Sequence, residues 1–239
     1  MSPSDLDKSA ASIRSMFEGV APRYDFLNHF LSASLDRRWR RHAELELDPP
    51  TTTAESARVL DLCCGTGDQA LSLGSRGQNV TAADFCVPML ALAQGKAERS
   101  NGRGPSLLAA DTLALPFRSA RFAAVTMSFG ARNLADLDRG LREAAQVLRS
   151  GGKVVILEFA VPRLPVLRQV YLVYLRRILP WIGKLLSPRG SAYAYLRDSV
   201  LEFPQRDDFT ARLQAAGFKN TRWRDLSFGT VCLYTGHKA

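Results

Sequence analysis

The sequence contains few of the residues that build metal sites and disulfide frameworks. Among its 239 residues there are only four cysteines and three histidines. No Cys-x-x-Cys pair occurs, and His29, His42 and His237 are scattered along the chain, so the sequence predicts neither a zinc site nor another metal site. The cysteines are expected to be reduced and buried.

Long apolar runs are also absent. No stretch approaches the roughly 18 apolar residues of a membrane-spanning helix, and residues 1–20 lack the apolar centre of a secretory signal. We therefore expect a cytoplasmic protein. With 46% apolar and 23% charged residues, the composition is typical of a globular protein, and 239 residues fit a single domain.

Acidic residues are fewer than basic ones. The chain has 23 Asp and Glu against 32 Lys and Arg, a net charge of +9. Between residues 161 and 200 there are seven basic residues and one acid, Asp198, so much of the excess lies there. A positive excess favours an anionic partner, such as a membrane surface or a nucleic acid.

The segment VLDLCCGTGD (59–68) is the most informative part of the chain. An apolar run there breaks into two glycines, Gly65 and Gly67, with Asp61 four residues ahead of the first. Glycines allow a sharp turn and bring main-chain N–H groups close to a ligand, so the segment predicts a strand followed by a nucleotide-binding turn. Asp61 would then face a positive charge on that ligand.

Two further β-prone segments end in an acid. Asp84 lies 19 residues after Gly65, where a βαβ unit places the carboxylate that binds a ribose diol. Asp111 ends the next such segment, and we expect Asp111 or the backbone of Thr112 beside an adenine. Three such acids around one glycine turn suit an adenosine that carries a cation.

A dinucleotide enzyme is the alternative at this point, because Gly65-x-Gly67-x-x-Ala70 also matches the fingerprint of NAD enzymes. Asp61 favours S-adenosylmethionine instead. Its carboxylate would repel a pyrophosphate but attract a sulfonium by about 4 kcal/mol at an effective dielectric constant of about 20.

The order of predicted elements indicates an α/β fold. From about residue 54 to residue 159, β-rich runs alternate with helical runs, which predicts a mostly parallel twisted sheet with helices on both faces. A helix is expected over 201–216, followed by an antiparallel hairpin from 218–226 and 229–235. The single domain would then comprise a helical lid (1–50), a cofactor-binding core (54–159), a basic amphipathic insertion (160–200) and a C-terminal helix and hairpin (201–239).

These residues form part of longer motifs that resemble the C-methyltransferases of ubiquinone and menaquinone biosynthesis. The motifs are VAPRYDFLN (20–28), VLDLCCGTGD (59–68), LPF (115–117), FGARN (129–133), LEF (157–159), AYAYL (192–196) and AGF (216–218). They span nearly the whole chain. The resemblance implies a Rossmann-like class I methyltransferase fold and transfer of a methyl group from S-adenosylmethionine to the ring of a prenylated quinol.

The resemblance also implies which residues contact the methyl donor. They are Thr66, Asp84, Asp111, Thr112 and Ser128. The sequence departs from the family at Ala131, where Leu is usual, and at Ser34 and Asp36, where Gly and His are usual. The turn CCGTGD favours demethylmenaquinol as the acceptor, with the benzoquinol of ubiquinone biosynthesis as the alternative.

Four residues are expected at the acceptor. Arg132 and Asn133 lie just beyond the predicted fourth strand, and Arg132 would stabilise oxyanion character on the ring or orient a water that removes the proton. Tyr24 and Asp25 would close the pocket from the lid. The alternatives are a surface salt bridge between Arg132 and Asp136, and a packing role for Tyr24.

The basic insertion suggests a partner. At 100° per residue, Arg168, Arg176, Arg177 and Lys184 lie in one half of a helical wheel opposite most of the apolar residues, with an interruption at Pro180. Such helices would lie at an anionic membrane; the alternative is a helix that packs on the core.

Nucleic acid is not expected as a partner. The segment FGARN (129–133) lacks the Asn-Pro-Pro-aromatic motif of base-methylating enzymes, which disfavours an RNA methyltransferase. A non-enzymatic adenosine-binding module is a further alternative. The expected partners are a prenylated quinol, an anionic membrane and a second copy of the chain in a homodimer.

Overall fold

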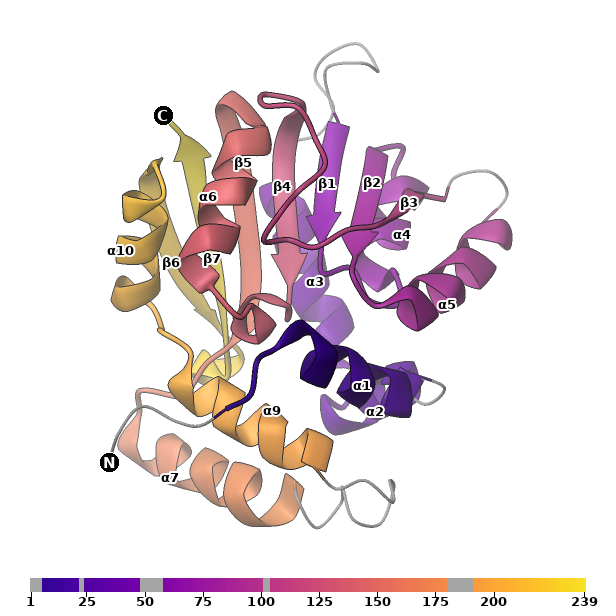
Figure 1. Ribbon diagram of the computed structural model, residues 1–239. Coiled ribbons are helices and arrows are strands. Elements are labelled where there is room, and N and C mark those ends of the chain that lie inside the picture. The colour runs from indigo at the N-terminus through magenta and orange to yellow at the C-terminus, as the bar shows by residue number, and fades with distance from the viewer. Residues whose placement is uncertain (1–5, 22–23, 48–57, 101–103, 180–190) are drawn as a thin grey trace.

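A seven-stranded mixed sheet forms the centre of the molecule, with helices on both faces (Figure 1). The computed structural model describes residues 6–21, 24–47, 58–100, 104–179 and 191–239. Pro180 and Lys184 of the insertion lie outside the described residues. The fold is Rossmann-like, as predicted.

Five parallel strands and one antiparallel hairpin make up the sheet. The strands are β1 (Arg58–Leu62), β2 (Asn79–Asp84), β3 (Ser106–Ala109), β4 (Phe122–Ser128), β5 (Leu148–Phe159), β6 (Phe218–Leu226) and β7 (Val231–Lys238). Their order is β3-β2-β1-β4-β5-β7-β6. The hairpin is confirmed, and its second strand, β7, pairs antiparallel with β5. The order reverses between β1 and β4, which is where α/β sheets open a crevice for ligands.

Helices cover both faces of the sheet and one of its edges. They are α1 (Ala10–Val20), α2 (Tyr24–Leu31), α3 (Leu35–Glu46), α4 (Asp68–Ser75), α5 (Val87–Glu98), α6 (Leu137–Val147), α7 (Pro165–Val173), the π-helical turn η3 (Tyr174–Ile178), α9 (Ser191–Glu202) and α10 (Asp207–Ala215). Short 3₁₀ turns follow β4 (η2, Ala131–Asn133) and β6 (η4, Ser227–Gly229).

The alternation of side chains along β1 divides the core into two layers. Leu60 and Leu62 pack with residues of α6 and α10, whereas Val59 packs on the opposite face with α3 and α4. Successive strand residues point to opposite faces of a sheet, so Asp61 shares the Val59 face. Both layers are apolar, which fixes the register of the central strands.

The helices of the predicted lid lie in two different places. α3 packs on the sheet face through Trp39, Ala43 and Leu47, because residues four apart lie on one side of a helix. α1 and α2 lie instead beyond the carboxyl ends of the strands, together with α7, η3 and α9 from the insertion (Figure 1). We call these elements, α1, α2, α7, η3 and α9, the cap helices. Among the described residues, no helix combines the length and apolar character needed to cross a bilayer.

The prediction of one helix over 201–216 is wrong. α9 ends at Glu202 and α10 begins at Asp207. Pro204 lacks a backbone N–H and disfavours helical geometry in the residue before it, so the helix cannot continue through this point. The break turns the chain from the cap back to the sheet.

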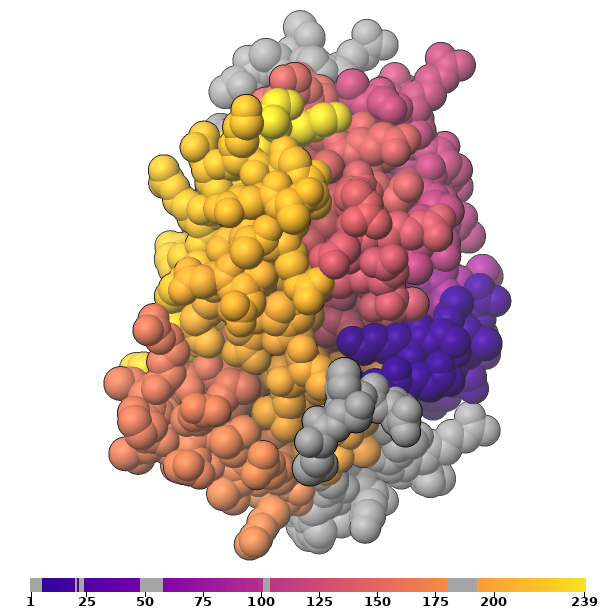
Figure 2. Space-filling model, turned by 60° about the vertical axis from the view of Figure 1, so that its left-hand side comes forward, coloured from indigo at the N-terminus to yellow at the C-terminus, as the bar shows by residue number. Residues whose placement is uncertain are grey.

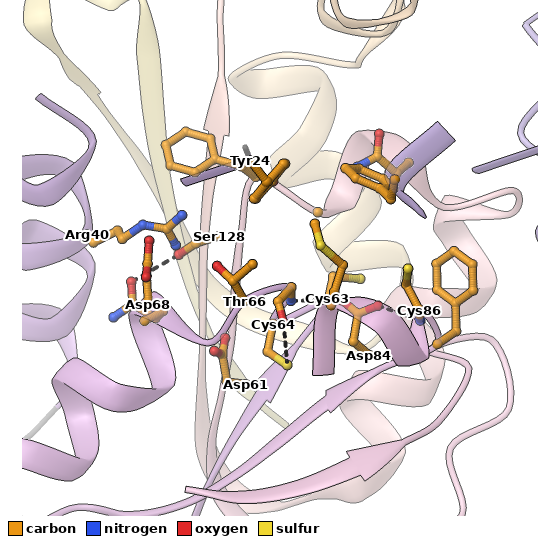
Figure 3. A pocket seen from close by; sticks show the side chains of 18 of the residues that line it. Tyr24, Arg40, Asp61, Cys63, Cys64, Thr66, Asp68, Asp84, Cys86 and Ser128 are labelled. Carbon is orange, nitrogen blue, oxygen red and sulfur yellow. Dashed lines mark hydrogen bonds between the residues drawn. The ribbon is translucent and has the colours of Figure 1, made fainter. Parts of the chain in front are cut away.

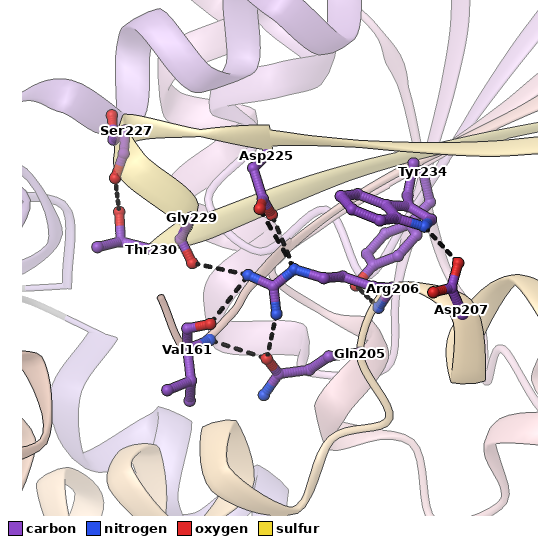
Figure 4. Close-up of polar contacts among 10 residues, drawn as sticks. Val161, Gln205, Arg206, Asp207, Asp225, Ser227, Gly229, Thr230 and Tyr234 are labelled. Atoms are coloured by element: carbon purple, nitrogen blue, oxygen red, sulfur yellow. Dashed lines mark hydrogen bonds and ion pairs between the residues drawn. The ribbon is translucent and has the colours of Figure 1, made fainter. Parts of the chain in front are cut away.

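Arg206 holds this break in place. Its φ of +55° lies in the left-handed region, which is unfavourable for a residue with a side chain. Its guanidinium donates to the carboxylate of Asp225 and to the carbonyl oxygens of Val161 and Gly229, and its N–H donates to Tyr234 Oη (Figure 4). Arg206 therefore ties the end of β5, the α9–α10 junction and the tip of the hairpin together.

Replacing Arg206 with alanine is expected to lower the free energy of unfolding by roughly 2–4 kcal/mol, because several half-buried hydrogen bonds are lost together. Arg206→Gly loses the same contacts but relieves the positive φ, so its loss should be smaller by about 1 kcal/mol. Urea unfolding measures both. The control is Arg212→Ala, which removes an exposed ion pair with Asp138 and should cost less than about 1 kcal/mol. Equal losses for the alanine and glycine variants would mean that Arg206 carries no backbone strain.

Candidate active site

Two adjoining cavities lie where the sheet order reverses. The smaller, about 50 Å³, lies at the ends of β1, β2 and β4 and is lined by the glycine turn; we call it the turn cavity. The larger, about 370 Å³, lies between the cap helices and the ends of β4 and β5; we call it the cap cavity. Phe17, Tyr24, Arg40, Phe129 and Asn133 line both, so a molecule in one can meet a molecule in the other.

The glycine turn has the predicted geometry. Gly65 and Gly67 have φ values of +55° and +83°, which residues with side chains rarely adopt. A Cβ atom at Gly67 would also lie 3.1 Å from Cβ of Ala93 on α5. The turn leads directly into α4, whose N-terminus attracts negative or polar ligand groups.

Asp84 comes to the turn from the end of β2. Its carboxylate accepts hydrogen bonds from the N–H groups of Gly65 and Cys86, each 2.8 Å long. Burial raises its pKa, and these two hydrogen bonds oppose the rise. Figure 3 shows Asp84 and Asp61 reaching the turn from neighbouring strands. The position fits the predicted ribose contact, which stays a prediction.

Asp61 is the most unusual group in the turn cavity. Its side chain is 1% exposed, yet neither carboxylate oxygen has a hydrogen-bond partner among the described residues. Burial raises its pKa to about 7, although the positive charge of Arg40 and the backbone N–H of Ala70, which lies too far or too poorly aligned for a full hydrogen bond, act in the opposite direction. A buried carboxylate without a partner is costly, and a cationic ligand in the cavity would relieve that cost. The residues present therefore fit a positively charged ligand.

Thr66 and Ser128 also line the turn cavity. Ser128 Oγ, at the end of β4, donates to Oε1 of Gln69 at 3.2 Å, and Gln69 Nε2 donates in turn to Glu44 on α3. Sequence reasoning missed Gln69, and nothing in its local pattern distinguishes it from an ordinary residue of α4. It is 1% exposed and lines the cavity beside Ser128.

Two predicted donor contacts lie outside both cavity walls. Asp111 is exposed, and its carboxylate accepts from the N–H of Leu113. Thr112 is buried, with its hydroxyl 3.5 Å from the sulfur of Cys63. An adenine contact at Asp111 and Thr112 stays a prediction.

Asp25 fastens α2 to the glycine turn. Its carboxylate accepts from the hydroxyl of Thr66 and lies 2.6 Å from Lys96 Nζ, which also pairs with Asp68 at 2.7 Å. Asp25 lines neither cavity, whereas Tyr24 lines both. The closing role expected for these two residues stays a prediction, and of the two only Tyr24 lines the cavities.

Phe17 of α1 and Tyr24 of α2 line the turn cavity, and Asp25 fastens α2 to the glycine turn, so we expect these helices to move when the donor enters. Lys96→Gln is expected to raise both the association and the dissociation rate of the donor several-fold, because the cation that joins Asp25 to Asp68 is lost. Stopped-flow fluorescence with S-adenosylmethionine measures both rates. Lys219→Gln, on strand β6 away from the site, is the control. Unchanged rates would show that this ion pair does not limit opening.

Arg132 lies in η2, at the end of β4, and lines the cap cavity. Its guanidinium pairs at 2.8 Å with Glu158, which is fully buried in β5, and lies over the ring of Phe159. The Nε atom of Arg132 has no hydrogen-bond partner among the described residues. The alternative of a surface salt bridge with Asp136 is wrong, because Arg132 is buried and its guanidinium pairs with Glu158.

Asn133 joins two motifs that lie far apart in the sequence. Its Oδ1 accepts from the hydroxyl of Tyr195 at 3.2 Å, which links FGARN (129–133) to AYAYL (192–196). Burial raises the pKa of Tyr195 to about 12, so its hydroxyl stays protonated and donates this bond. The cap cavity is otherwise mainly aromatic and aliphatic, with Tyr171, Tyr174 and Leu175 on its outer wall.

Arg40 and Glu158 are functional candidates that sequence reasoning missed. Arg40 lines both cavities and lies over the ring of Phe129, 5.3 Å from its centre. Arg40 could have been predicted from its spacing, because it lies four residues after Asp36 and therefore on the same side of α3. Glu158 could not have been predicted in this way, because the sequence of an apolar strand does not show which basic residue pairs with an acid in it.

The structure also brings together three residues of metal-binding types. Ligand atoms of His29, Asp36 and Asp68 lie within 4.8 Å of one another, a grouping that the sequence did not predict. His29 Nδ1 already lies 2.9 Å from Asp36, whose other oxygen accepts from Ser32, and Asp68 pairs with Lys96. These existing contacts explain the cluster without a metal.

Comparison with known proteins gives the family. The model of the ubiE/COQ5 methyltransferase family matches residues 5–238, nearly the whole chain. The chain belongs to this family. A ubiquinone/menaquinone biosynthesis C-methyltransferase of Geotalea daltonii is 41% identical over 237 residues, which cover 98% of this chain and 99% of the relative. A demethylmenaquinone methyltransferase of Thermus thermophilus is 45% identical over 226 residues, 93% of this chain and 100% of the relative.

Solved structures show the same fold at low sequence identity. An S-adenosylmethionine-dependent methyltransferase from Thermotoga maritima has a TM-score of 0.63 and 18% identity, covering 94% of this chain and 99% of that one. A phosphoethanolamine N-methyltransferase from Haemonchus contortus, solved with S-adenosylmethionine, has a TM-score of 0.62 and 14% identity over 84% of this chain and 52% of that one. Family membership makes the chain a methyltransferase and decides against the dinucleotide enzyme and the non-enzymatic module.

Proposed function

We propose that the protein transfers a methyl group from S-adenosylmethionine to a ring carbon of demethylmenaquinol, giving menaquinol. The observation that carries the proposal is Asp61, a buried carboxylate without a partner, at the end of a cavity that adjoins a larger apolar one. The turn cavity suits a cationic donor, and the cap cavity suits a prenylated ring. Family membership and the names of its relatives support this assignment.

The donor would lie in the turn cavity. Asp61 would stabilise its positive charge, Asp84 its ribose, and Thr66 and Ser128 its polar groups. Bound there, the donor supplies a methyl group on sulfonium sulfur. The residues shared by the two cavities, Tyr24 and Asn133 among them, would hold the ring carbon in line with that group, and such positioning is worth roughly 7–11 kcal/mol at best.

Methyl transfer to carbon requires electron density on the ring. The carbon–sulfur bond breaks with its electron pair left on sulfur, a carbon–carbon bond forms with an electron pair of the ring, and the ring gives up one proton to water. Arg132 and Arg40 both line the cap cavity, and of the two Arg132 would stabilise a phenolate oxygen of the quinol as the bond forms. Glu158 holds the guanidinium in place from beneath.

The test combines donor binding with turnover. Isothermal titration should show binding of S-adenosylmethionine but not of NADH, and incubation with a prenylated 1,4-naphthoquinol should give the methylated quinol and S-adenosylhomocysteine. A prenylated benzoquinol serves as the competing acceptor. Donor binding without transfer to the naphthoquinol would overturn the proposal, and preferential transfer to the benzoquinol would reassign the ring.

The acceptor also bears on where the reaction takes place. A prenyl tail partitions into lipid, whereas the structure has no membrane-spanning helix among the residues it describes. We therefore place the reaction at the cytoplasmic face of a membrane, with the protein in peripheral contact.

A further inference from the structure

Large apolar side chains are exposed on the cap more than elsewhere. Five of them lie between residues 164 and 178: Leu164, Val166, Val170, Val173 and Ile178, with exposures of 45–75%. Soluble surfaces carry isolated apolar residues, but a contiguous group marks a contact with another molecule or with lipid.

α7 carries apolar residues on two sides. Tyr171 and, in the turn that follows, Tyr174 and Leu175 face inward and line the cap cavity. Val166, Val170 and Val173 are 75%, 63% and 50% exposed, and their spacing of four and three residues puts them on one outer stripe. A helix that only packs on the core needs apolar residues on its inner side alone. The outer stripe (Val166, Val170 and Val173) is therefore unexplained by the fold.

Basic residues lie on the same segment as this stripe. Arg177, four residues after Val173, lies on the side of the stripe, whereas Arg168, two residues after Val166, lies on another side of α7. Arg168, Arg176 and Arg177 are exposed, and none forms an ion pair with an acid among the described residues. Arg163 also lies near, over the ring of Trp223. Unpaired arginines beside exposed apolar side chains are the combination that binds an anionic lipid surface, through burial of the apolar groups and attraction to the headgroups.

A second exposed apolar pair lies on α2. Phe26 and Phe30 are 63% and 58% exposed, and their rings stack with centres 5.9 Å apart. α2 and η3 meet where Tyr174 Oη donates to the carbonyl oxygen of Leu31 at 3.4 Å. Phe26 and Phe30 thus lie on a helix that contacts η3, the turn that follows α7, and both α2 and η3 wall the cap cavity.

We propose that the outer stripe of α7, with Arg168, Arg176 and Arg177, is the surface by which this protein docks on an anionic phospholipid bilayer. This docking surface rests on the proposed function, because it would serve a reaction on a prenylated quinol. Figure 2 shows the residues of α7, in the orange-pink colour of that part of the bar, as an outer surface at the lower end of the molecule. Because the inner side of the same helix walls the cap cavity, docking would bring that cavity to the lipid surface, where a prenyl tail lies.

The experiment is sedimentation of the full-length protein with vesicles of phosphatidylglycerol and phosphatidylcholine, or of phosphatidylcholine alone. The wild type should bind the anionic vesicles at low salt, at least tenfold less to neutral vesicles, and less as salt rises. Val166→Ser/Val170→Ser/Val173→Ser and Arg168→Gln/Arg176→Gln/Arg177→Gln should each lower binding at least tenfold. Val87→Ser/Leu92→Ser, which changes exposed apolar residues on α5, should bind as the wild type does.

Two activity measurements separate this proposal from the proposed function. The valine variant should lose turnover of a long-tailed quinol in vesicles but keep donor binding and turnover of a short-tailed quinol in solution. Vesicle binding without turnover of either quinol would overturn the function and leave the docking surface.

Three results would overturn the docking surface itself. They are no vesicle binding by the wild type, equal loss in the α5 control, and a dimer in analytical ultracentrifugation that the valine substitutions dissociate. The last result would assign the stripe to a second copy of the chain.

Discussion

Replacing Arg132 is expected to reduce turnover of a prenylated quinol by roughly a hundredfold or more, with donor affinity unchanged. Removal of one positioned group that stabilises a developing oxyanion typically costs this much. Arg132 lines the cap cavity but not the turn cavity, so its replacement should leave the affinity for the donor unchanged.

The choice of variant matters because Arg132 pairs with a fully buried acid. Arg132→Ala leaves Glu158 charged and unpaired, which costs about 3–5 kcal/mol of stability. The double variant Arg132→Gln/Glu158→Gln removes both charges and keeps amide groups of similar size. We expect it to fold, to bind the donor and to lose turnover. Single-turnover assays and isothermal titration on the same preparation measure the two effects.

Arg132→Lys and Glu158→Gln distinguish charge from position. The lysine keeps the positive charge but not the planar fork, so part of the turnover should remain. Glu158→Gln keeps Arg132 but weakens its support; if Glu158 positions the guanidinium, kcat should fall while KM for the quinol changes little. Full turnover in the double variant would remove Arg132 from the mechanism.

Asp61→Asn is expected to weaken S-adenosylmethionine binding at pH 8 by at least tenfold. A charge pair at 4 Å is worth about 4 kcal/mol at an effective dielectric constant of about 20, and opposition from Arg40 reduces that figure. The same substitution should leave the free protein no less stable at pH 8, because it removes an unpaired buried charge. A change that weakens binding without destabilising the fold separates a ligand contact from a structural role.

The raised pKa of Asp61 also sets a pH dependence. With a pKa of about 7 in the free protein, the carboxyl is mostly neutral at pH 6 and mostly ionised at pH 8. Donor affinity should therefore rise about tenfold over this range, because only the ionised form attracts the cation. Stability of the free protein should change in the opposite direction. The folded carboxyl binds its proton more tightly than the unfolded one, so burial of Asp61 makes folding less favourable as pH rises from about 4 to 7.

Titration calorimetry from pH 6 to pH 8 on both proteins tests this. Asp61→Asn serves as the control for titration of the donor itself, and its affinity should vary much less with pH than that of the wild type. Parallel pH profiles for the two proteins would contradict a role for the Asp61 charge in donor binding.

Local patterns predicted much of the fold because they have local causes. The glycine turn follows from backbone freedom at Gly65 and Gly67, and the central strands follow from continuous apolar runs that only a sheet buried on both faces accommodates. The prediction of a single helix over 201–216 was wrong because Pro204 and the positive φ of Arg206 break the helix. The contacts that hold Arg206 in this conformation come from Asp225 and Gly229, which lie further along the chain.

By itself, the sequence determined the parallel core, the position of the cofactor turn and the acids at the ends of its strands, since each depends on residues within one strand and the turn after it. Only the tertiary structure decided which partners those residues have. Glu158 lies beneath Arg132, Asp25 fastens to Thr66 and Lys96, and α7 exposes a second apolar side. These contacts join segments between 26 and 71 residues apart, or depend on which side of a helix the cavity occupies, and no periodicity within one segment carries that information.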